Sequence, residues 1–275
     1  MKKLLALCLS GLLLTGCGGI HGPTKVEHEF ELELAEENAL ILSDGTAVDR
    51  WQPSYVTYNY YKLKDGTELL RENLPCDPEK VYVSGRESFD NLPENTAKAI
   101  SAYYEDLGLL YDLETEVEGA YQAYLSCREE GEKFFSRVLG QSTNLCASNE
   151  TVVYLETSVK LPLDRRNGRY VTEYDVGAAF DRETGEVIPV WDLFTLPEED
   201  VKALIVEEFA PRSEAERAEM LEKLTADYLV FQPDSLNVFF PQGVISTQAH
   251  SSGVGIEYSE LTGVLHDWAV PDPMK

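Results

Sequence analysis

The chain has few of the residues on which catalytic and metal sites depend. Its 275 residues include only four histidines: His21, His28, His250 and His266. It contains no HExxH, GxSxG or SxxK motif and no phosphate-binding loop. Its cysteines lack the CxxC pairs that are typical of zinc sites. The sequence therefore predicts no enzymatic activity, no metal and no cofactor.

Basic side chains are also scarce. The chain has 23 Lys and Arg against 49 Asp and Glu, which gives a net charge of −26. A net charge this negative repels phosphate groups. It therefore argues against binding to nucleic acid and against binding to anionic lipid through a basic patch. The simplest interpretation is solubility at a polyanionic cell surface. The alternative is an acidic face that attracts a cationic protein.

The only long apolar run lies at the N-terminus. Leu4–Leu14 follows the basic Met1-Lys-Lys3 and ends in Leu14-Thr-Gly-Cys17. A run of this length is too short for a permanent membrane helix, which needs about 20 residues. The segment is similar to the lipobox of bacterial lipoproteins, which implies cleavage after residue 16 and a lipid anchor on Cys17. The alternative is an ordinary signal peptide with an incidental cysteine.

Three cysteines remain once Cys8 leaves with the signal segment and Cys17 takes lipid: Cys76, Cys127 and Cys146. They would lie outside the cytoplasm, where disulfides can form. We expect one bridge and one buried thiol, with Cys76–Cys146 and Cys127–Cys146 both open because sequence does not fix connectivity. No histidine motif accompanies them, which argues against a catalytic thiol.

The most regular pattern lies between residues 151 and 194. Val152–Leu161 and Arg169–Phe180 alternate like strands and flank Asn167-Gly168, a strong hairpin signal because both turn positions need positive φ. A second turn, Asp181–Gly185, follows. The second strand would place Tyr174, Val176, Ala178 and Phe180 on one face and Glu173 and Asp175 on the other. We interpret the segment as the central meander of an antiparallel sheet.

The region before this meander is predicted to contain strands and then helices. Strands are expected at His28–Leu34, Ala39–Leu42, Tyr55–Leu63 and Val81–Val83. The row Tyr55, Tyr58, Tyr60 and Tyr61 suits either a sugar-stacking platform or, as we favour, cross-strand packing. A first helix is expected at Pro93–Asp106. One long helix should then run from Leu110 through Val138, because its apolar residues keep steps of three and four.

The C-terminal third alternates helices and strands. Thr195-Leu-Pro-Glu198 has the pattern of a capping box, and the helix after it would bury Val201, Leu204, Ile205 and Phe209. A second helix is expected at Ser213–Leu224. Strands are predicted at Tyr228–Phe231, Leu236–Phe240 and Val254–Tyr258.

A polar loop, Gln242–Gly253, separates the last two predicted strands and has no evident role in packing. Loops of this kind carry function more often than strands do. The candidate binding residues are Gln242, Gln248, His250 and Ser251 of the loop, with Trp191 and Tyr258 as neighbouring aromatics. A catalytic interpretation would instead combine His250 and Ser251 with an acid such as Glu257.

Several motifs of the second half resemble the extracellular domain family DUF3298. They are Asp181–Gly185 with Val187-Ile188, Trp191-Asp-Leu-Phe194 before a helix, Leu236–Phe240, and Ile256–Leu261. The helical region upstream is where a DUF4163-like domain would fit. The resemblance covers roughly Val81 to Leu265. It implies an α+β fold, with helices packed on a curved, mainly antiparallel β-sheet.

These observations divide the chain into four parts: a signal peptide at 1–16, the lipidated Cys17 with a flexible tether at 17–27, a β-rich and DUF4163-like region at 28–150, and a DUF3298-like domain at 151–275. The family pair occurs beside peptidoglycan deacetylase domains and in RsiV-type anti-sigma factors, whose extracellular part binds lysozyme. The resemblance thus implies a membrane-anchored, non-catalytic binding protein facing outside the cytoplasm. Its partner would be peptidoglycan or a cationic, lysozyme-like protein. The alternative is a hydrolase or accessory module acting on peptidoglycan.

Overall fold

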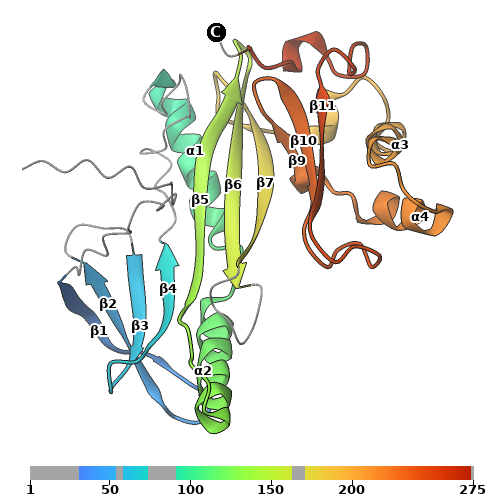
Figure 1. Cartoon of the computed structure of the whole chain (residues 1–275). Coiled ribbons are helices and arrows are strands. Elements are labelled where there is room, and N and C mark those ends of the chain that lie inside the picture. Colours follow the sequence, from blue (N-terminus) through green and yellow to red (C-terminus); the bar gives the residue numbers. More distant parts are fainter. Residues whose placement is uncertain (1–30, 54–57, 74–90, 163–170, 274–275) are drawn as a thin grey trace, which may run out of the picture. The chain divides into compact units, whose positions relative to one another are not determined.

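The computed structural model describes residues 31–53, 58–73, 91–162 and 171–273. These residues form an eight-stranded sheet, in which β1 to β8 lie in chain order, and a three-stranded sheet with the order β11–β10–β9 (Figure 1). The paired strands are antiparallel, except that β4 and β5 are parallel. The predicted α+β class with a mainly antiparallel sheet is confirmed.

The bounds of the elements are as follows. The strands are β1 Leu32–Ile41, β2 Ala47–Pro53, β3 Tyr58–Leu63, β4 Glu68–Asn73, β5 Arg137–Ser148, β6 Val152–Pro162, β7 Val171–Asp181, β8 Val187–Ile188, β9 Leu229–Phe231, β10 Ser235–Phe240 and β11 Ser252–Glu257. The α-helices of the described part are α1 Glu94–Leu107, α2 Leu113–Glu130, α3 Glu198–Glu208 and α4 Glu214–Lys223. Short 3-10 helices are η3 Val190–Leu193, η4 Ala226–Tyr228 and η5 Asp267–Ala269.

The first four strands form a meander with one face packed on α2. Tight turns at Gly45 (φ +86°) and Gly66 (φ +89°) connect β1 to β2 and β3 to β4. Both turns need the left-handed conformation that glycine adopts without steric cost. The core between these strands and α2 is made of Leu42, Val48, Tyr61, Leu63, Leu69, Leu70, Val117, Ala120, Tyr121 and Leu139.

The predicted helix from Leu110 through Val138 is wrong in its last turns. Helix α2 ends at Gly131, which is left-handed (φ +70°) and donates its N–H to Cys127 O. The chain then forms β5, which pairs with β4 on one side and β6 on the other. Phe134 and Val138 continue the helical spacing of α2. The conformation of Gly131 ends the helix before them.

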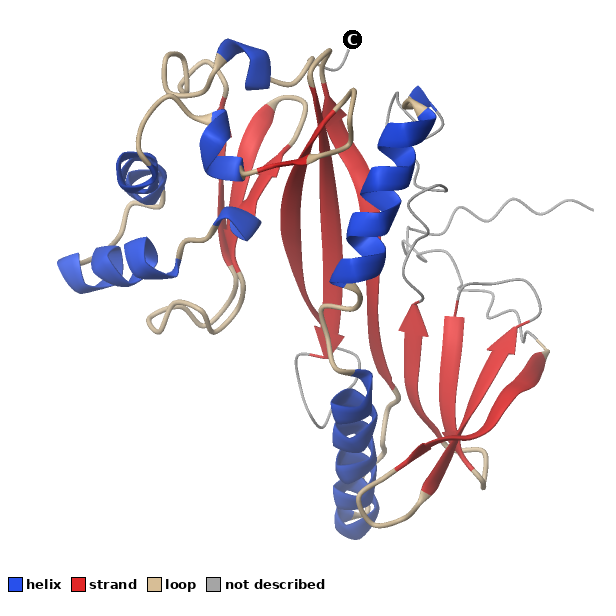
Figure 2. Cartoon of the chain, turned by 180° about the vertical axis from the view of Figure 1, so that it is seen from behind, coloured by secondary structure: helices blue, strands red, loops and turns tan. Residues whose placement is uncertain are grey.

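Strands β5 to β7 have buried residues on both faces, which corrects the expectation of a polar face on β7. On one face, Val153 and Phe180 pack with Ile100 of α1. Figure 2 shows this helix lying along the sheet. On the other face, Tyr154 and Ala179 belong to the core formed with the smaller sheet. The four strand residues divide between the two faces because alternate residues of a strand point to opposite sides.

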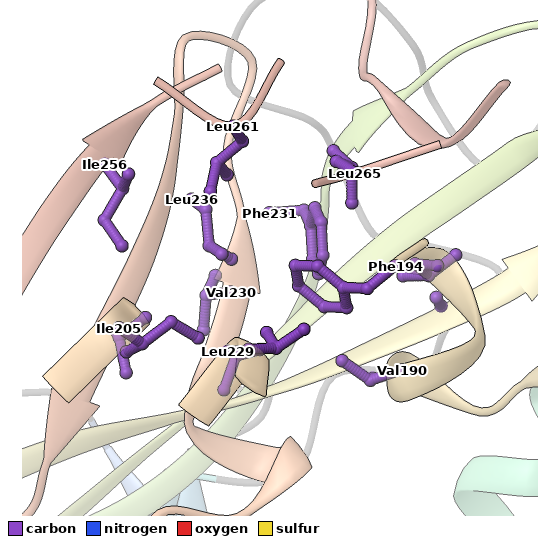
Figure 3. Close-up of a cluster of buried hydrophobic side chains, with 14 of the residues drawn as sticks. Val190, Phe194, Ile205, Leu229, Val230, Phe231, Leu236, Ile256, Leu261 and Leu265 are labelled. Atoms are coloured by element: carbon purple, nitrogen blue, oxygen red, sulfur yellow. The ribbon is translucent and has the colours of Figure 1, made fainter. Parts of the chain in front are cut away.

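The smaller sheet comes very close to β7. A Cβ on Gly177 would lie 1.9 Å from Leu229 O, so only glycine fits there. Around this contact, η3, α3 and strands β9 to β11 contribute buried side chains to one core (Figure 3). Its labelled members are Val190, Phe194, Ile205, Leu229, Val230, Phe231, Leu236, Ile256, Leu261 and Leu265.

The start of α3 differs from the prediction, whereas that of α4 agrees with it. The Thr195 hydroxyl donates to Gly263 O (2.7 Å), and α3 begins after Pro197 without a side-chain cap. The predicted capping box is therefore wrong. Leu204, expected in the buried stripe of α3, is 45% exposed. In α4, the Ser213 hydroxyl accepts from Glu216 N (3.1 Å), as an N-cap does.

Cys127 and Cys146 are both free and buried, so the expected disulfide through Cys146 is wrong. The Cys146 thiol lies 3.3 Å from the carbonyl oxygens of Tyr154 and Phe231, inside the core between the sheets. Burial raises the pKa of this thiol, which keeps it protonated. Cys76 lies outside the described residues.

Several predictions fall on other parts of the chain that the structure does not describe. These are the signal segment, Cys17 and its tether, the strand at Val81–Val83, and the Asn167-Gly168 turn. The predicted boundary after residue 150 lies in the turn between β5 and β6, two neighbours in the larger sheet. Within the described ranges, no helix is long and apolar enough to cross a membrane.

Candidate functional site

The loop between β10 and β11, residues 241–251, is fixed to helix α4 by two carboxylates. Glu219 accepts hydrogen bonds from the backbone N–H (3.0 Å) and the hydroxyl (2.8 Å) of Ser246. Glu216 accepts from the Thr247 hydroxyl (2.7 Å) and from Arg212 N (2.6 Å). The Thr247 and Arg212 hydrogen bonds lower the pKa of Glu216, because they favour its ionised form.

The loop brings four of the predicted binding residues together. The Gln242 side chain donates to Ala249 O (3.0 Å), and the Gln248 side chain accepts from the Ser252 hydroxyl. His250 and Ser251 are exposed. Internal hydrogen bonds thus shape the loop, and the imidazole of His250 is presented to solvent.

The other two predicted residues lie elsewhere. Strand β11 pairs with β10 so that Ser252 faces Phe240 and Glu257 faces Ser235. A strand rises about 3.3 Å per residue, so the loop and Tyr258 are at opposite ends of the small sheet, roughly 20 Å or more apart. The same register separates Glu257 from the loop. A catalytic group of His250, Ser251 and Glu257 is therefore excluded.

Tyr258 and Trp191 both have structural contacts. The Tyr258 hydroxyl lies 2.6 Å from Gln232 O and 3.1 Å from Ser235 O, which ties it to the turn between β9 and β10. Trp191 packs against Phe194 with ring centroids 6.1 Å apart. The Lys202 ammonium lies 5.4 Å from the Trp191 ring centroid. Both aromatics are partly buried against the core.

A hollow of about 320 Å³ lies over α3 and α4, and it was not predicted from the sequence. Leu196 and Leu204 line it and are 37% and 45% exposed. The remaining lining residues are Asp200, Ala203, Glu207 and Arg217. The hollow therefore combines an exposed apolar surface with charged groups.

A second hollow of about 520 Å³ adjoins the first. The two share Glu207 and Arg217, whose side chains form a 2.6 Å ion pair. Ala210 lines the second hollow and has φ +48°, an uncommon conformation for a residue with a Cβ. The segment from residue 196 to 223 holds nine acidic and four basic side chains. We call these two hollows and their lining residues the α3–α4 groove.

Glu156, which lies next to Asp175 on the larger sheet, has the most strongly raised pKa of the described carboxyl groups. Glu156 of β6 accepts from the Gln232 amide (2.8 Å), and Asp175 of β7 accepts from the Ser158 hydroxyl (2.6 Å). Burial, and next the charge of Asp175, raise the pKa of Glu156 to about 7. A carboxyl group whose pKa is raised in this way can act as a general acid near neutral pH.

Sequence reasoning missed both the groove and this carboxylate pair for identifiable reasons. Leu204 matches the helical spacing of buried residues, so periodicity assigned it to the core. Glu156 and Asp175 lie on two different strands, and only the pairing of Glu156 with Gly177 and of Ser158 with Asp175 brings them together. With 49 acidic residues in the chain, no single pair stands out without this register.

Fold and surface together define an α+β protein with an acidic, partly apolar groove. No protein-family model matches the sequence, and no curated protein is similar to it. A solved DUF3298 family protein from Pseudomonas aeruginosa PAO1 is similar, with 14% identity and a TM-score of 0.31; the match covers 48% of this chain and 65% of that protein's length. A DUF3298 family member from Bacteroides fragilis has 10% identity and a TM-score of 0.44, covering 74% of this chain and 87% of its own.

Proposed function

We propose that this protein is a lipoprotein, anchored outside the cytoplasm through Cys17, whose folded part binds a cationic, lysozyme-like protein without catalysing a reaction. The observation that carries the proposal is the α3–α4 groove. Its exposed Leu196 and Leu204 lie beside Asp200 and Glu207. Exposed apolar groups surrounded by charged ones are typical of protein-interaction sites.

The charge of the chain supports a cationic partner. A net charge of −26 speeds the encounter with a basic protein, and the nine acidic side chains between residues 196 and 223 concentrate this field near the groove. The loop at 241–251 is held to α4, one of the two helices of the groove, by Glu216 and Glu219. Gln248 and His250 would then make contacts at the edge of the interface.

Binding of lysozyme to the unlipidated mature chain tests this function. Leu204→Lys replaces an apolar contact with a charge of the same sign as the partner, so we expect at least about tenfold weaker binding at physiological salt. Leu109→Lys is the matched control, because Leu109 is also an exposed leucine (40%) but lies outside the groove. Circular dichroism verifies that both variants fold.

Two results would overturn the proposal: equal affinity of wild type and Leu204→Lys, or an equal loss in both variants. Affinity should also fall as salt is raised, because surface charges are screened beyond about 8–10 Å. Turnover of glycan or peptide substrates that disappears in His250→Ala would contradict the non-catalytic part. If peptidoglycan retains the chain and lysozyme does not, the ligand is a glycan and not a protein.

A hydrolase or accessory module acting on peptidoglycan is the second candidate. The observation in its favour is the Glu156–Asp175 pair, in which the pKa of Glu156 is raised to about 7. A carboxyl with such a pKa is suited to donate a proton at neutral pH. Release of soluble sugar from peptidoglycan by wild type, and its loss in Glu156→Gln, would support this function. No release by wild type would exclude it.

A further inference from the structure

The first four strands have a second face that does not contact α2, and it combines aromatic with basic side chains. In β3, Asn59, Tyr61 and Leu63 are buried, whereas Tyr58, Tyr60 and Lys62 are partly exposed. This alternation follows from the two-residue period of a strand. The tyrosine row predicted from the sequence is thus divided between two faces.

The pairing of the strands aligns these side chains in one row. Leu34 pairs with Trp51, Trp51 with Tyr60, and Tyr60 with Arg71. Directly paired residues project from the same face, with Cβ atoms about 5 Å apart. Tyr58 lies two positions before Tyr60 in β3, so it projects from the same face. We call Trp51, Tyr58, Tyr60, Lys62 and Arg71 the aromatic row.

Both cations of the aromatic row lie over rings. The Arg71 guanidinium is 6.0 Å from the Tyr58 ring centroid, and the Lys62 ammonium is 5.7 Å from that of Tyr60. Among the described residues, neither cation forms an ion pair, and Arg71 Nε has no hydrogen-bond partner. This is unexpected in a chain with 49 acidic and 23 basic residues.

The acids that pair with Lys62 across the sheet have other partners. Asp49 accepts from the Lys64 ammonium (2.9 Å) and from Asn38 N (2.8 Å). Glu68 accepts from the Ser136 hydroxyl (2.9 Å). Within the part of the chain that the structure describes, the charges of Lys62 and Arg71 therefore have no acidic partner and can pair with a ligand.

The opposite face shows what polar groups do when their role is structural. Glu72 is buried there and accepts from Asn59 (2.8 Å), Tyr61 (2.9 Å) and Tyr111 (2.8 Å). Gln52 donates to Asn59 and extends the network. These groups satisfy one another, as buried polar groups must. The cations of the aromatic row lack such partners.

We propose that the aromatic row binds a glycan that carries carboxylate groups. Sugar rings present flat C–H faces that pack on aromatic rings, for which Trp51 and Tyr60 provide adjacent surfaces. Arg71 would donate hydrogen bonds to a carboxylate of the glycan, and Lys62 would add a second charge. This site adds to the protein-binding function proposed above and does not depend on it.

The negative charge of the chain does not prevent this contact. At physiological salt the Debye length is about 8 Å, so the field of distant carboxylates is largely screened. The charges close to the ligand then determine the electrostatic contribution to binding. In the aromatic row these charges are the cations Lys62 and Arg71. Repulsion at longer range should make association weaker at low salt, the opposite of the dependence expected for a cationic protein at the α3–α4 groove.

The experiment is calorimetric titration of the unlipidated mature chain with soluble peptidoglycan fragments, which contain sugars and carboxylates. We expect Trp51→Ala to weaken binding at least about tenfold and Arg71→Gln several-fold. Trp268→Ala is the matched control, since Trp268 is a surface tryptophan (40% exposed) outside the row. Neutral chitotetraose should bind wild type more weakly than the fragments do.

A second measurement covers the case in which Trp51→Ala fails to fold. The chain has three tryptophans, so Trp191→Phe with Trp268→Phe leaves Trp51 as the only indole. Its fluorescence should shift when the fragments bind. The proposal is overturned if fragments bind without this shift, if Trp268→Ala loses as much affinity as Trp51→Ala, or if chitotetraose binds as tightly as the fragments.

Discussion

Strands β5 to β7 and strands β1 to β4 belong to one sheet but have different surroundings. The central strands are covered on both faces, by α1 on one and by the smaller sheet on the other. The first strands pack on α2 with one face only, and Leu34 on the other is 46% exposed. The same alternation of side chains thus builds a core in one region and a core plus an accessible surface in the other.

The difference indicates where function can be located in a chain without catalytic motifs. Side chains buried on both faces are constrained by packing, and substitutions there act first on stability. Side chains on a free face are less constrained by packing, so an unusual composition needs a different reason. The aromatic row and the α3–α4 groove both lie on surfaces where packing places few constraints on which residues can occur.

The largest expected effect contrasts Phe180 with Tyr60. Phe180 is fully buried and contacts Tyr103 edge to face, with centroids 5.1 Å apart. Phe180→Ala should lower the free energy of unfolding by about 3–5 kcal/mol. Tyr60→Ala, on the free face, should cost about 1 kcal/mol or less. Urea denaturation measures both, and equal losses would remove the distinction between the two regions.

A somewhat smaller effect is expected at the contact between the sheets. Gly177→Ala would push a methyl group against Leu229 O, and we expect a loss of about 3 kcal/mol. Gly255→Ala is the control, because its added Cβ would meet only side-chain atoms, Asn237 Oδ1 at 3.1 Å and Ser235 Oγ at 3.8 Å. That variant should lose less than about 1 kcal/mol. A thermal melt in which Gly177→Ala equals wild type would show that the sheets pack less closely than described.

The smallest effect concerns pH. The pKa of Glu156 is raised from 4.5 to about 7, so between these values the native chain holds a proton that the unfolded chain releases. The resulting stability is present below pH 4.5 and is lost as pH rises through 7. Because Glu156 is only partly buried, Glu156→Gln should be more stable than wild type by about 1–2 kcal/mol at pH 8, and by only a small part of that at pH 5.

Urea titrations at pH 5 and pH 8 test this prediction. Glu173→Gln is the control, since Glu173 lies on the neighbouring strand β7 but is exposed and pairs with Lys160 (3.1 Å). A pH-independent difference between wild type and Glu156→Gln would mean that Glu156 titrates normally.

Local patterns predicted a large part of this fold. The two-residue period of Val152–Leu161 and Arg169–Phe180 gave β6 and β7 nearly to their ends, because alternation is a strong signal over ten residues. Gln232–Ser235 correctly separated β9 from β10, and Ser213 correctly began α4. In each case the residues that decide the structure are neighbours in sequence.

The failures come from contacts between distant residues. Val138 fits both a helix that continues α2 and a strand, and only its pairing with Arg71 in β4 decides for the strand. Thr195 has the pattern of a cap, but Gly263, 68 residues later, accepts its hydroxyl. The loop with His250 lies between the last two strands, as predicted, and its role in binding stays a prediction. Its attachment to Glu216 and Glu219 was not foreseeable, because it depends on how α4 packs.

The parallel pairing of β4 with β5 also determines how the chain can fold. Leu70 pairs with Arg137, so this pairing closes a loop that contains both α1 and α2. The other consecutive strands of the sheet are separated by at most eight residues. Contacts between nearby residues form fast, and closing a long segment costs more entropy. The two meanders should therefore form early and join late. Until they join, each presents an unpaired strand, β4 or β5, that can pair with another copy of the chain. Folding yield should accordingly depend on protein concentration.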